Sequence, residues 1–180
     1  MMDDTHRLLA LVGFGFSLVI LAGCGTAASA PHPASHPKLR TQSFFDPSLA
    51  NADQYVTFHV TRPSQTEGYQ PKNIYVTLPP KASLRSKDTQ ITLTYQGTSG
   101  TFQLMETTLP MQIGGSGVRT ASVEGHTIQS QALTVGTGEP SITVQTRYHG
   151  VSYQLTAVEK TGSTPMSAAT ADAILLSALP

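Results

Sequence analysis

The stretch SITVQTRYHGVSYQLTA, Ser141 to Ala157, decides the fold, because it contains two strand-like runs joined by only two residues. Ser141 to Tyr148 and Val151 to Ala157 are rich in β-branched and aromatic residues, which suit the pleated surface of a sheet. The connection, His149-Gly150, has the length that favours a primed turn, and Gly150 adopts a positive φ at little cost. The stretch therefore predicts a β-hairpin.

A two-residue period extends over most of the chain from Phe44 onward, and such a period predicts short strands with one buried face. Alternating apolar residues stand at Val56, Phe58 and Val60, at Ile74, Val76 and Leu78, at Ile91, Leu93 and Tyr95, and at Phe102 and Leu104. Further runs cover Val118 to Val123 and Thr127 to Val135, and the turn at Gly97-Thr98-Ser99-Gly100 predicts a second hairpin. The pattern predicts about eight short strands.

One helix is predicted at the end of the chain. Thr164 suits its N-cap, Pro165 suits the first helical position, and the helix runs on to Leu179. Its predicted inner face carries Ala169, Ala173 and Leu176. A single helix packed on a mostly antiparallel sheet is an α+β fold, and residues 44–180 are enough for one such domain.

The first 24 residues carry a different signal. An uncharged stretch begins at Leu8 and ends at Leu21-Ala22-Gly23-Cys24, which resembles the bacterial lipobox. This resemblance implies cleavage between Gly23 and Cys24, and attachment of a diacylglyceryl group to the Cys24 thiol. Because Cys24 is the only cysteine, it has no disulfide partner within the chain. Residues 1–23 are therefore predicted to be a lipoprotein signal peptide.

An uncleaved membrane helix is the alternative for this segment. Leu8 to Cys24 is 17 residues, which span about 25 Å as a helix, whereas the hydrocarbon core of a bilayer is about 30 Å thick. The helix is therefore marginal in length, and a cleavable apolar region of this size is usual in exported proteins. The sequence thus favours a lipid anchor that holds the protein on the extracytoplasmic side of the cell membrane.

Residues 24–43 are predicted to be the lipidated cysteine followed by a flexible tether. The segment is composed mainly of Ala, Ser, Pro and His, and without apolar periodicity it buries too little surface to offset the entropy of ordering. His32 and His36 repeat at a spacing of four, but each is followed by proline, which argues against a helix that would align them on a metal. No metal or cofactor is predicted.

The charge balance excludes some partners. The chain has 11 basic and 11 acidic residues, and the leader holds Arg7, Asp3 and Asp4, which leaves 10 against 9 in the predicted mature protein. A domain of near-zero net charge without a Lys or Arg cluster has no electrostatic footprint for a phosphate backbone. Nucleic acid is therefore not a predicted partner.

Known catalytic arrangements are not visible in the sequence. It contains no phosphate-binding loop, no His-Glu-x-x-His and no acidic calcium loop. The spacing of Glu106, Glu124 and Glu159 does not bring two carboxyls together, and His59 and His149 fall on a predicted strand and in a turn. The sequence therefore predicts a protein that is not an enzyme.

Several segments follow one another in a recognisable order: Tyr55 to Val60, Pro63, Gly68-Tyr69, Ile91 to Tyr95, and Tyr153 to Thr156 before a closing helix. This order resembles an uncharacterised domain of exported Gram-positive proteins, often found beside regions similar to the outer-membrane lipoprotein carrier and in sporulation-associated proteins. The resemblance covers most of the range from Ser48 to Leu179. It implies the fold and an exported location, and it supplies no catalytic residues.

Three functional hypotheses follow from these patterns. The favoured one is a non-enzymatic surface lipoprotein that binds a protein or an envelope component. The second is a carrier or sensor of an apolar ligand held in a cavity between sheet and helix. The third is a hydrolase that acts on the cell envelope.

Overall fold

The computed structural model describes residues 42–180, apart from residues 47, 79–84, 86–87 and 137. The predicted signal peptide with Leu21, Ala22, Gly23 and Cys24 lies outside the described residues, as does the tether up to residue 41. The last two tether residues, Gln42 and Ser43, belong to the first strand, so regular structure begins two residues before the predicted boundary at Phe44.

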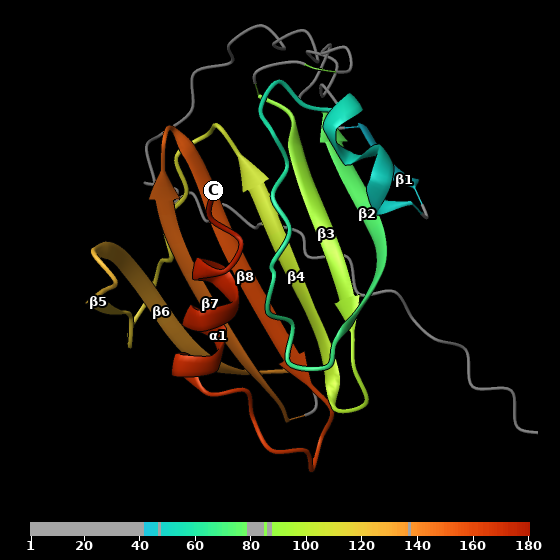
Figure 1. Ribbon diagram of the computed structural model, residues 1–180. Coiled ribbons are helices and arrows are strands. Elements are labelled where there is room, and N and C mark those ends of the chain that lie inside the picture. Colours follow the sequence, from blue (N-terminus) through green and yellow to red (C-terminus); the bar gives the residue numbers. More distant parts are fainter. Residues whose placement is uncertain (1–41, 47, 79–84, 86–87, 137) are drawn as a thin grey trace, which may run out of the picture. The chain divides into compact units, whose positions relative to one another are not determined.

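Eight antiparallel strands form one sheet in the described part of the chain, and the predicted α+β fold is confirmed (Figure 1). The strand order is β1-β2-β3-β4-β8-β7-β6-β5, so two meanders of four strands meet where β4 pairs with β8. The strands are β1 (Gln42–Asp46), β2 (Gln70–Leu78), β3 (Gln90–Gln96), β4 (Gly100–Thr107), β5 (Arg119–Val123), β6 (His126–Val135), β7 (Glu139–Tyr148) and β8 (Val151–Glu159).

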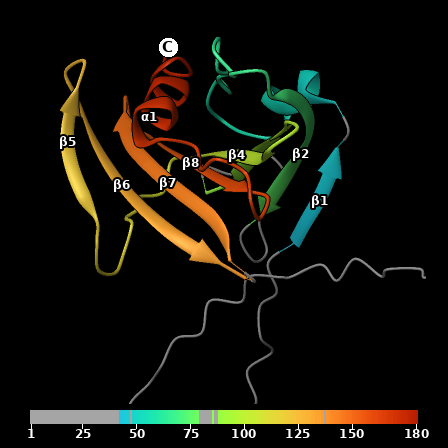
Figure 2. The same ribbon diagram turned by 90° about the horizontal axis from the view of Figure 1, so that it is seen from below.

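The sheet curves around two segments that lie on its concave side (Figure 2). One is the C-terminal helix α1 (Ala168–Leu176), which contacts β6, β7 and β8. The other begins with the 3-10 helix η1 (Leu49–Gln54), which contacts β2, and continues to Tyr69. Together they cover the apolar face of the sheet.

The concave face is apolar because successive side chains of a strand point to opposite faces. One row across five paired strands consists of side chains that are all completely buried: Ile74, Leu93, Leu104, Leu155 and Val144. From the helix, Ala171, Ile174 and Leu175 pack onto this face. The hydrophobic core therefore lies between the sheet and the two segments that cover it.

The convex face carries mostly uncharged polar residues. We call one row of paired residues the central row; it runs from β1 to β6 through Phe45, Tyr75, Thr92, Met105, Gln154, Gln145 and Gln129. A neighbouring row consists of Thr94, Gln103, Thr156, Thr143 and Gln131. Neither row contains a charged side chain.

The predicted hairpins are confirmed. His149 and Gly150 connect β7 to β8 with φ values of +47° and +83°, which is the pair of positive angles that a type I′ turn needs. Residues 97–100 connect β3 to β4 as predicted. A Cβ on Gly100 would stand 2.3 Å from the carbonyl oxygen of Val158, so β4 approaches β8 here at a distance that only glycine permits.

The strand predicted at Tyr55 to Val60 is wrong. This segment has bends instead, and the Asp53 side chain accepts a hydrogen bond of 2.7 Å from the backbone N–H of Val60, which draws the chain back toward η1. Val56 and Val60 are nevertheless buried, so the alternation correctly indicated burial but not backbone conformation. The eighth strand of the sheet is β1 instead, for which no strand was predicted.

The C-terminal helix exists and its predicted inner-face residue Leu176 packs against the core, but its cap, its end and two other predicted inner-face residues are wrong. Its N-cap is Ser167, whose hydroxyl accepts a 3.0 Å hydrogen bond from the backbone N–H of Thr170, and not Thr164. Ala169 and Ala173 are exposed, because the larger apolar side chains of Ile174 and Leu175 occupy the inner face. The helix also ends at Leu176 and not at Leu179.

Candidate functional site

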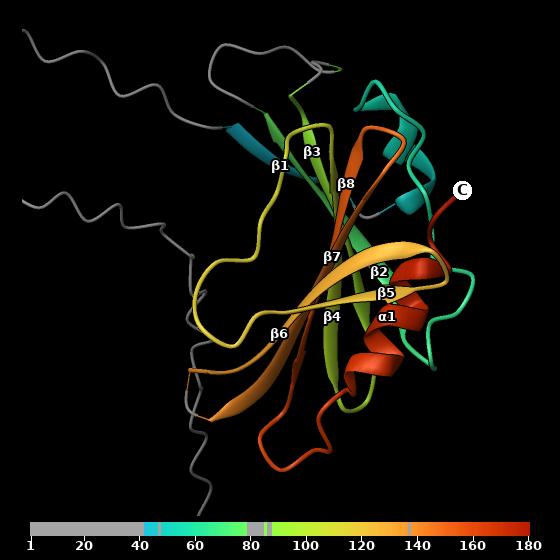
Figure 3. The ribbon, with the colours of Figure 1, turned by 90° about the vertical axis from the view of Figure 1, so that its left-hand side faces the viewer.

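A long connection covers part of the convex face. Residues 108–118 join β4 to β5 on the side of the sheet opposite α1 (Figure 3). Four side chains of the sheet donate hydrogen bonds to backbone carbonyls of this connection. Gln145 Nε2 donates to Met111 at 2.9 Å, Gln131 Nε2 to Ser116 at 2.7 Å, Arg147 Nη2 to Thr108 at 3.2 Å and Ser152 Oγ to Leu109 at 2.7 Å. The connection is therefore fixed to the sheet by polar side chains.

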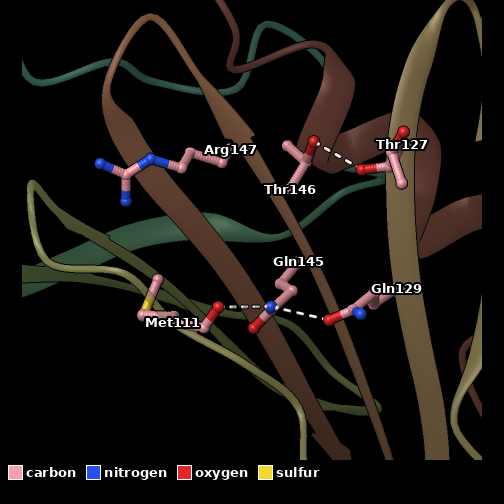
Figure 4. Close-up of a pocket in the computed structure, with 6 residues that line it drawn as sticks. All are labelled: Met111, Thr127, Gln129, Gln145, Thr146 and Arg147. Atoms are coloured by element: carbon pink, nitrogen blue, oxygen red, sulfur yellow. Dashed lines mark hydrogen bonds between the residues drawn. The ribbon is translucent and has the colours of Figure 1, made fainter.

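A hollow of about 200 Å³ opens beside this connection, over β6 and β7 (Figure 4). Most of the groups around it are amides, hydroxyls and one guanidinium. The lining residues are Met111, Thr127, Gln129, Gln145, Thr146 and Arg147. The hollow lies at one end of the central row, since Gln145 and Gln129 are its last two members.

Gln145 is the most informative residue of the hollow. It is only 7% exposed, and its Nε2 donates both to Met111 O and, at 3.0 Å, to Gln129 Oε1 (Figure 4). Its Oε1 is buried and has no hydrogen-bond partner among the described residues. A buried acceptor without a partner costs about 1–3 kcal/mol, so a donor that reached this oxygen would be bound favourably.

Arg147 contributes a fixed positive charge at the edge of the hollow. Its guanidinium donates to Ser152 Oγ at 2.8 Å and to the carbonyls of Gly150 and Thr108 at 2.9 and 3.2 Å. Three bonds hold the planar group in one orientation. The hollow thus combines amide and hydroxyl groups with one immobile cation, which is a set suited to binding and not to proton transfer.

The two histidines named from the sequence lie in different surroundings. His59 Nδ1 lies 3.2 Å from Asp53 Oδ1, and both line a hollow of about 260 Å³ with Val60 and Arg62. The His59 side chain is 79% exposed, so this ion pair is weak, and no serine or cysteine is among these lining residues. His149 stacks on Tyr148 in the exposed β7–β8 turn.

The three glutamates lie apart, as predicted. Glu124 is exposed in the turn between β5 and β6, whereas Glu106 and Glu159 are buried on the concave face. Glu106 lies near the end of β4, and Glu159 lies at the end of β8, where it pairs with Gly100 at the start of β4. Glu106 accepts hydrogen bonds from the backbone N–H and the hydroxyl of Thr61, at 3.2 and 3.3 Å. Burial raises the pKa of the Glu106 carboxyl to about 8.

No sequence motif pointed to the candidate binding residues Gln129, Gln145 and Arg147. Amides at alternate positions of β6, Gln129 and Gln131, were a visible signal, but the pairing of Gln129 with Gln145 on β7 depends on register, which the sequence alone does not show. The described residues contain no group of three or more His, Cys, Asp or Glu side chains placed to hold a metal ion. In the same part of the chain, no helix has the length and apolar character needed to cross a membrane.

Comparison with known proteins adds no relative: no family model, no curated protein and no solved structure matches this chain. The resemblance to the uncharacterised domain of exported Gram-positive proteins therefore stays a prediction.

Proposed function

We propose that this chain is a lipid-anchored, extracytoplasmic binding protein without enzymatic activity, and that its convex face binds an uncharged polysaccharide of the cell envelope. The observation that carries the proposal is the buried, unpartnered Oε1 of Gln145 in a hollow lined by amides and hydroxyls. Sugar hydroxyl and acetamido groups are donors and acceptors of the matching kind.

The central row supports a polymer over a small molecule. At its far end from the hollow, Phe45 and Tyr75 are 52% and 41% exposed, and their rings meet edge to face with centroids 5.6 Å apart. From Tyr75 on β2 to Gln129 on β6 the row crosses five strand spacings, or about 24 Å at roughly 4.8 Å each. Exposed aromatic rings stack on the faces of sugar rings, while amides bond to their hydroxyls. The row therefore suits a chain of several sugar units.

The anchor is supported by the sequence Leu21-Ala22-Gly23-Cys24 and by the tether that follows. Acyl chains contribute about 0.8 kcal/mol per buried methylene, so two or three chains on Cys24 would hold the protein on the cell membrane. A module tethered in this way meets envelope polymers continuously and needs only modest affinity for each sugar unit.

The binding proposal is tested with N-acetylglucosamine oligosaccharides and the full-length protein in detergent, by calorimetric titration. We expect the hexamer to bind more tightly than the dimer, and Gln145→Leu to weaken both by roughly ten-fold, or about 1.4 kcal/mol. Tyr75→Ala should weaken the hexamer but not the dimer, because Tyr75 lies at the opposite end of the row. Leu133→Ala, which truncates an exposed side chain four positions from Gln129 on β6, is the matched control and should change neither.

Gln129→Leu keeps the bond between Gln145 and Met111, so it tests the hollow if Gln145→Leu loosens the 108–118 connection. Thermal unfolding separates a folding defect from a binding defect. Equal affinity of the two oligosaccharides, or unchanged binding by both glutamine variants, would contradict the proposal. Tighter binding of an acidic oligosaccharide such as polygalacturonate would show that Arg147 selects an anion instead.

The anchor is tested separately, by labelling cells with an alkyne analogue of palmitate and by mass spectrometry of the native protein. We expect label on the unaltered protein and none on Cys24→Ser, with the mature chain beginning at Cys24. A chain that retains its first 23 residues, or an unmodified thiol, would exclude the anchor without affecting the binding proposal.

The other two hypotheses fare differently. Two hollows of about 160 and 310 Å³ beside the start of α1 favour a second binding activity of the carrier kind. A hydrolase is not proposed, because the hollow that pairs His59 with Asp53 has no nucleophile among its described lining residues.

A further inference from the structure

A hollow of about 310 Å³ lies on the concave side of the sheet, between its outer strands and the start of α1. Small-molecule sites typically measure about 300–1,000 Å³, so this hollow has the volume of a small site. Its lining comes from β5, β6, β7, the residues before β5 and the first residue of α1: Gly117, Arg119, Ser130, Ala132, Ile142 and Ala168. Arg119 is the only charged residue among these described lining residues.

The register of the strands places Arg119 on the concave face. The completely buried row that reaches Val144 on β7 continues to Ser130 on β6 and then to Arg119 on β5. Residues directly opposite each other on antiparallel strands share a face, with Cβ atoms about 5 Å apart. A guanidinium and a serine hydroxyl therefore stand side by side where the apolar row of the core meets the edge of the sheet.

The charge of Arg119 is not compensated within the described part of the chain. Its guanidinium forms no ion pair and no hydrogen bond with another described residue. Two other arginines differ from it, because Arg62 donates to the carbonyl of Leu49 and Arg147 is held by three bonds. Arg119 can therefore bond to an anion in the hollow without losing an internal contact.

The rest of the hollow is mostly apolar and continues beyond the reach of Arg119. Ala132, Ile142 and Ala168 form its apolar wall. Ala132 and Ile142 also line the neighbouring hollow of about 160 Å³, which extends to Pro165 and Met166. The two hollows thus provide a continuous apolar wall with a single cation at one end.

We propose that this hollow binds a single-chain fatty carboxylate, with the carboxylate on Arg119 and Ser130 and the chain along Ala132 and Ile142. One guanidinium matches the single charge of a carboxylate, and the hydroxyl supplies a further donor. The chain buries apolar surface that is otherwise open to water. The site is independent of the polysaccharide proposal, because it lies on the other face of the sheet.

The test uses octanoate, octanol and acetate, titrated calorimetrically into the full-length protein at constant detergent concentration. Each probe is compared between protein variants, so its partition into detergent cancels. We expect Arg119→Gln to weaken octanoate by at least roughly ten-fold and octanol by less than about two-fold, because only the carboxylate bonds to a charged group. Acetate should bind at least roughly a hundred-fold more weakly than octanoate, because it lacks the methylenes that the hollow buries.

Two pairs of variants separate charge from shape. Lys72→Gln removes a positive charge from β2, far from the hollow, and should leave octanoate binding unchanged, whereas Arg119→Lys keeps the charge and should retain the preference for octanoate over octanol. Ala132→Trp fills the hollow and should block both probes while Arg119 remains. Ala173→Trp adds the same volume at an exposed position of α1 outside the lining, and should change neither.

Thermal unfolding checks that each variant is folded before its affinity is compared. The proposal is overturned if Arg119→Gln weakens octanoate no more than Lys72→Gln does, or if acetate binds as tightly as octanoate. An inward charge on an edge strand can also prevent pairing with another copy of the chain. Self-association of Arg119→Gln in detergent, with octanoate binding unchanged, would assign Arg119 to that role and would likewise overturn the proposal.

Discussion

The two faces of the sheet are built from the same strands and differ in an unusual way. On the concave face, Leu93, Leu104 and Leu155 form part of a completely buried row, as in any sheet with one covered side. On the convex face, the matching positions are threonines, glutamines and one methionine, with no charge in either row described above. Solvated sheet faces usually carry many charged residues. The lack of charge in both rows therefore supports the proposed contact of this face with an uncharged partner.

The concave face, in contrast to the two uncharged rows of the convex face, carries buried acidic side chains. Glu106 and Glu159 lie buried on the concave face, where burial of a carboxyl is costly. Glu106 is matched by the N–H and hydroxyl of Thr61, whereas Glu159 is matched at one oxygen only. Glu106 is therefore a satisfied buried acid and Glu159 an unsatisfied one, and Glu159 lines a hollow.

The largest expected difference between the faces is in stability. Leu104→Ala should lower the free energy of unfolding by about 3 kcal/mol, because it leaves a cavity in a completely buried row. Gln103→Ala, one residue earlier and exposed on the convex face, should change it by less than about 0.5 kcal/mol. Urea denaturation measures both. Similar losses in the two variants would mean that the convex face is also part of the core.

Gly100 and Gly114 provide the next comparison. Gly100→Ala places a methyl group 2.3 Å from Val158 O and 2.4 Å from Glu159 Oε2, and should cost about 2 kcal/mol as β4 and β8 move apart. Gly114 lies in the 108–118 connection with no atom within 4 Å of its added Cβ, so Gly114→Ala should not destabilise the protein. Equal melting temperatures for the two variants would contradict the close contact of β4 with β8.

The buried Glu106 makes stability depend on pH. Its folded pKa of about 8 lies above the ordinary value of 4.5, so its contribution is fully present below pH 4.5 and is lost as pH rises through 8. Unfolding free energy should fall across this window by up to about 1.4 kcal/mol per pH unit, and Glu106→Gln should flatten that slope. A slope in the glutamine variant equal to that of the unaltered protein would assign the dependence to other groups.

The smallest effect expected concerns the helix that covers the concave face. Ser167→Ala removes the hydroxyl that accepts from the Thr170 N–H, and should cost about 1 kcal/mol. Thr164→Ala, at the cap position that the sequence indicated, should leave the unfolding free energy unchanged within about 0.5 kcal/mol. A larger loss at Thr164 than at Ser167 would restore the cap predicted from sequence.

Most of the sheet was predictable because its strands are local hairpins with clear turn residues. His149-Gly150 and the turn at 97–100 each identify a pair of neighbouring strands without knowledge of the rest of the chain. The error at Tyr55 to Val60 has a physical cause, since alternation reports which residues are buried and bends can bury alternate residues as well.

The candidate sites were less predictable, for two different reasons. The hollow at Gln145 depends on the register of β6 with β7 and on a connection that returns across the sheet, and neither is a local property. The burial of Glu106 and Glu159 could have been predicted from the sequence, because each continues the apolar alternation of its strand, after Leu104 and Ala157 respectively. An acidic residue that occupies the same alternate positions as the buried residues of a strand is therefore predicted to be buried as well.

The strand order also has a consequence for how the protein folds. Within each meander, neighbouring strands are joined in sequence and can form from local contacts, which is the fast part of folding. The β4–β8 pairing, which matches Gly100 with Glu159 and Thr107 with Ser152, is the only seam that joins the two halves of the described sheet. We therefore expect its closure to be the slow step, and a nascent chain would expose the inner surfaces of both halves until β8 has been synthesised.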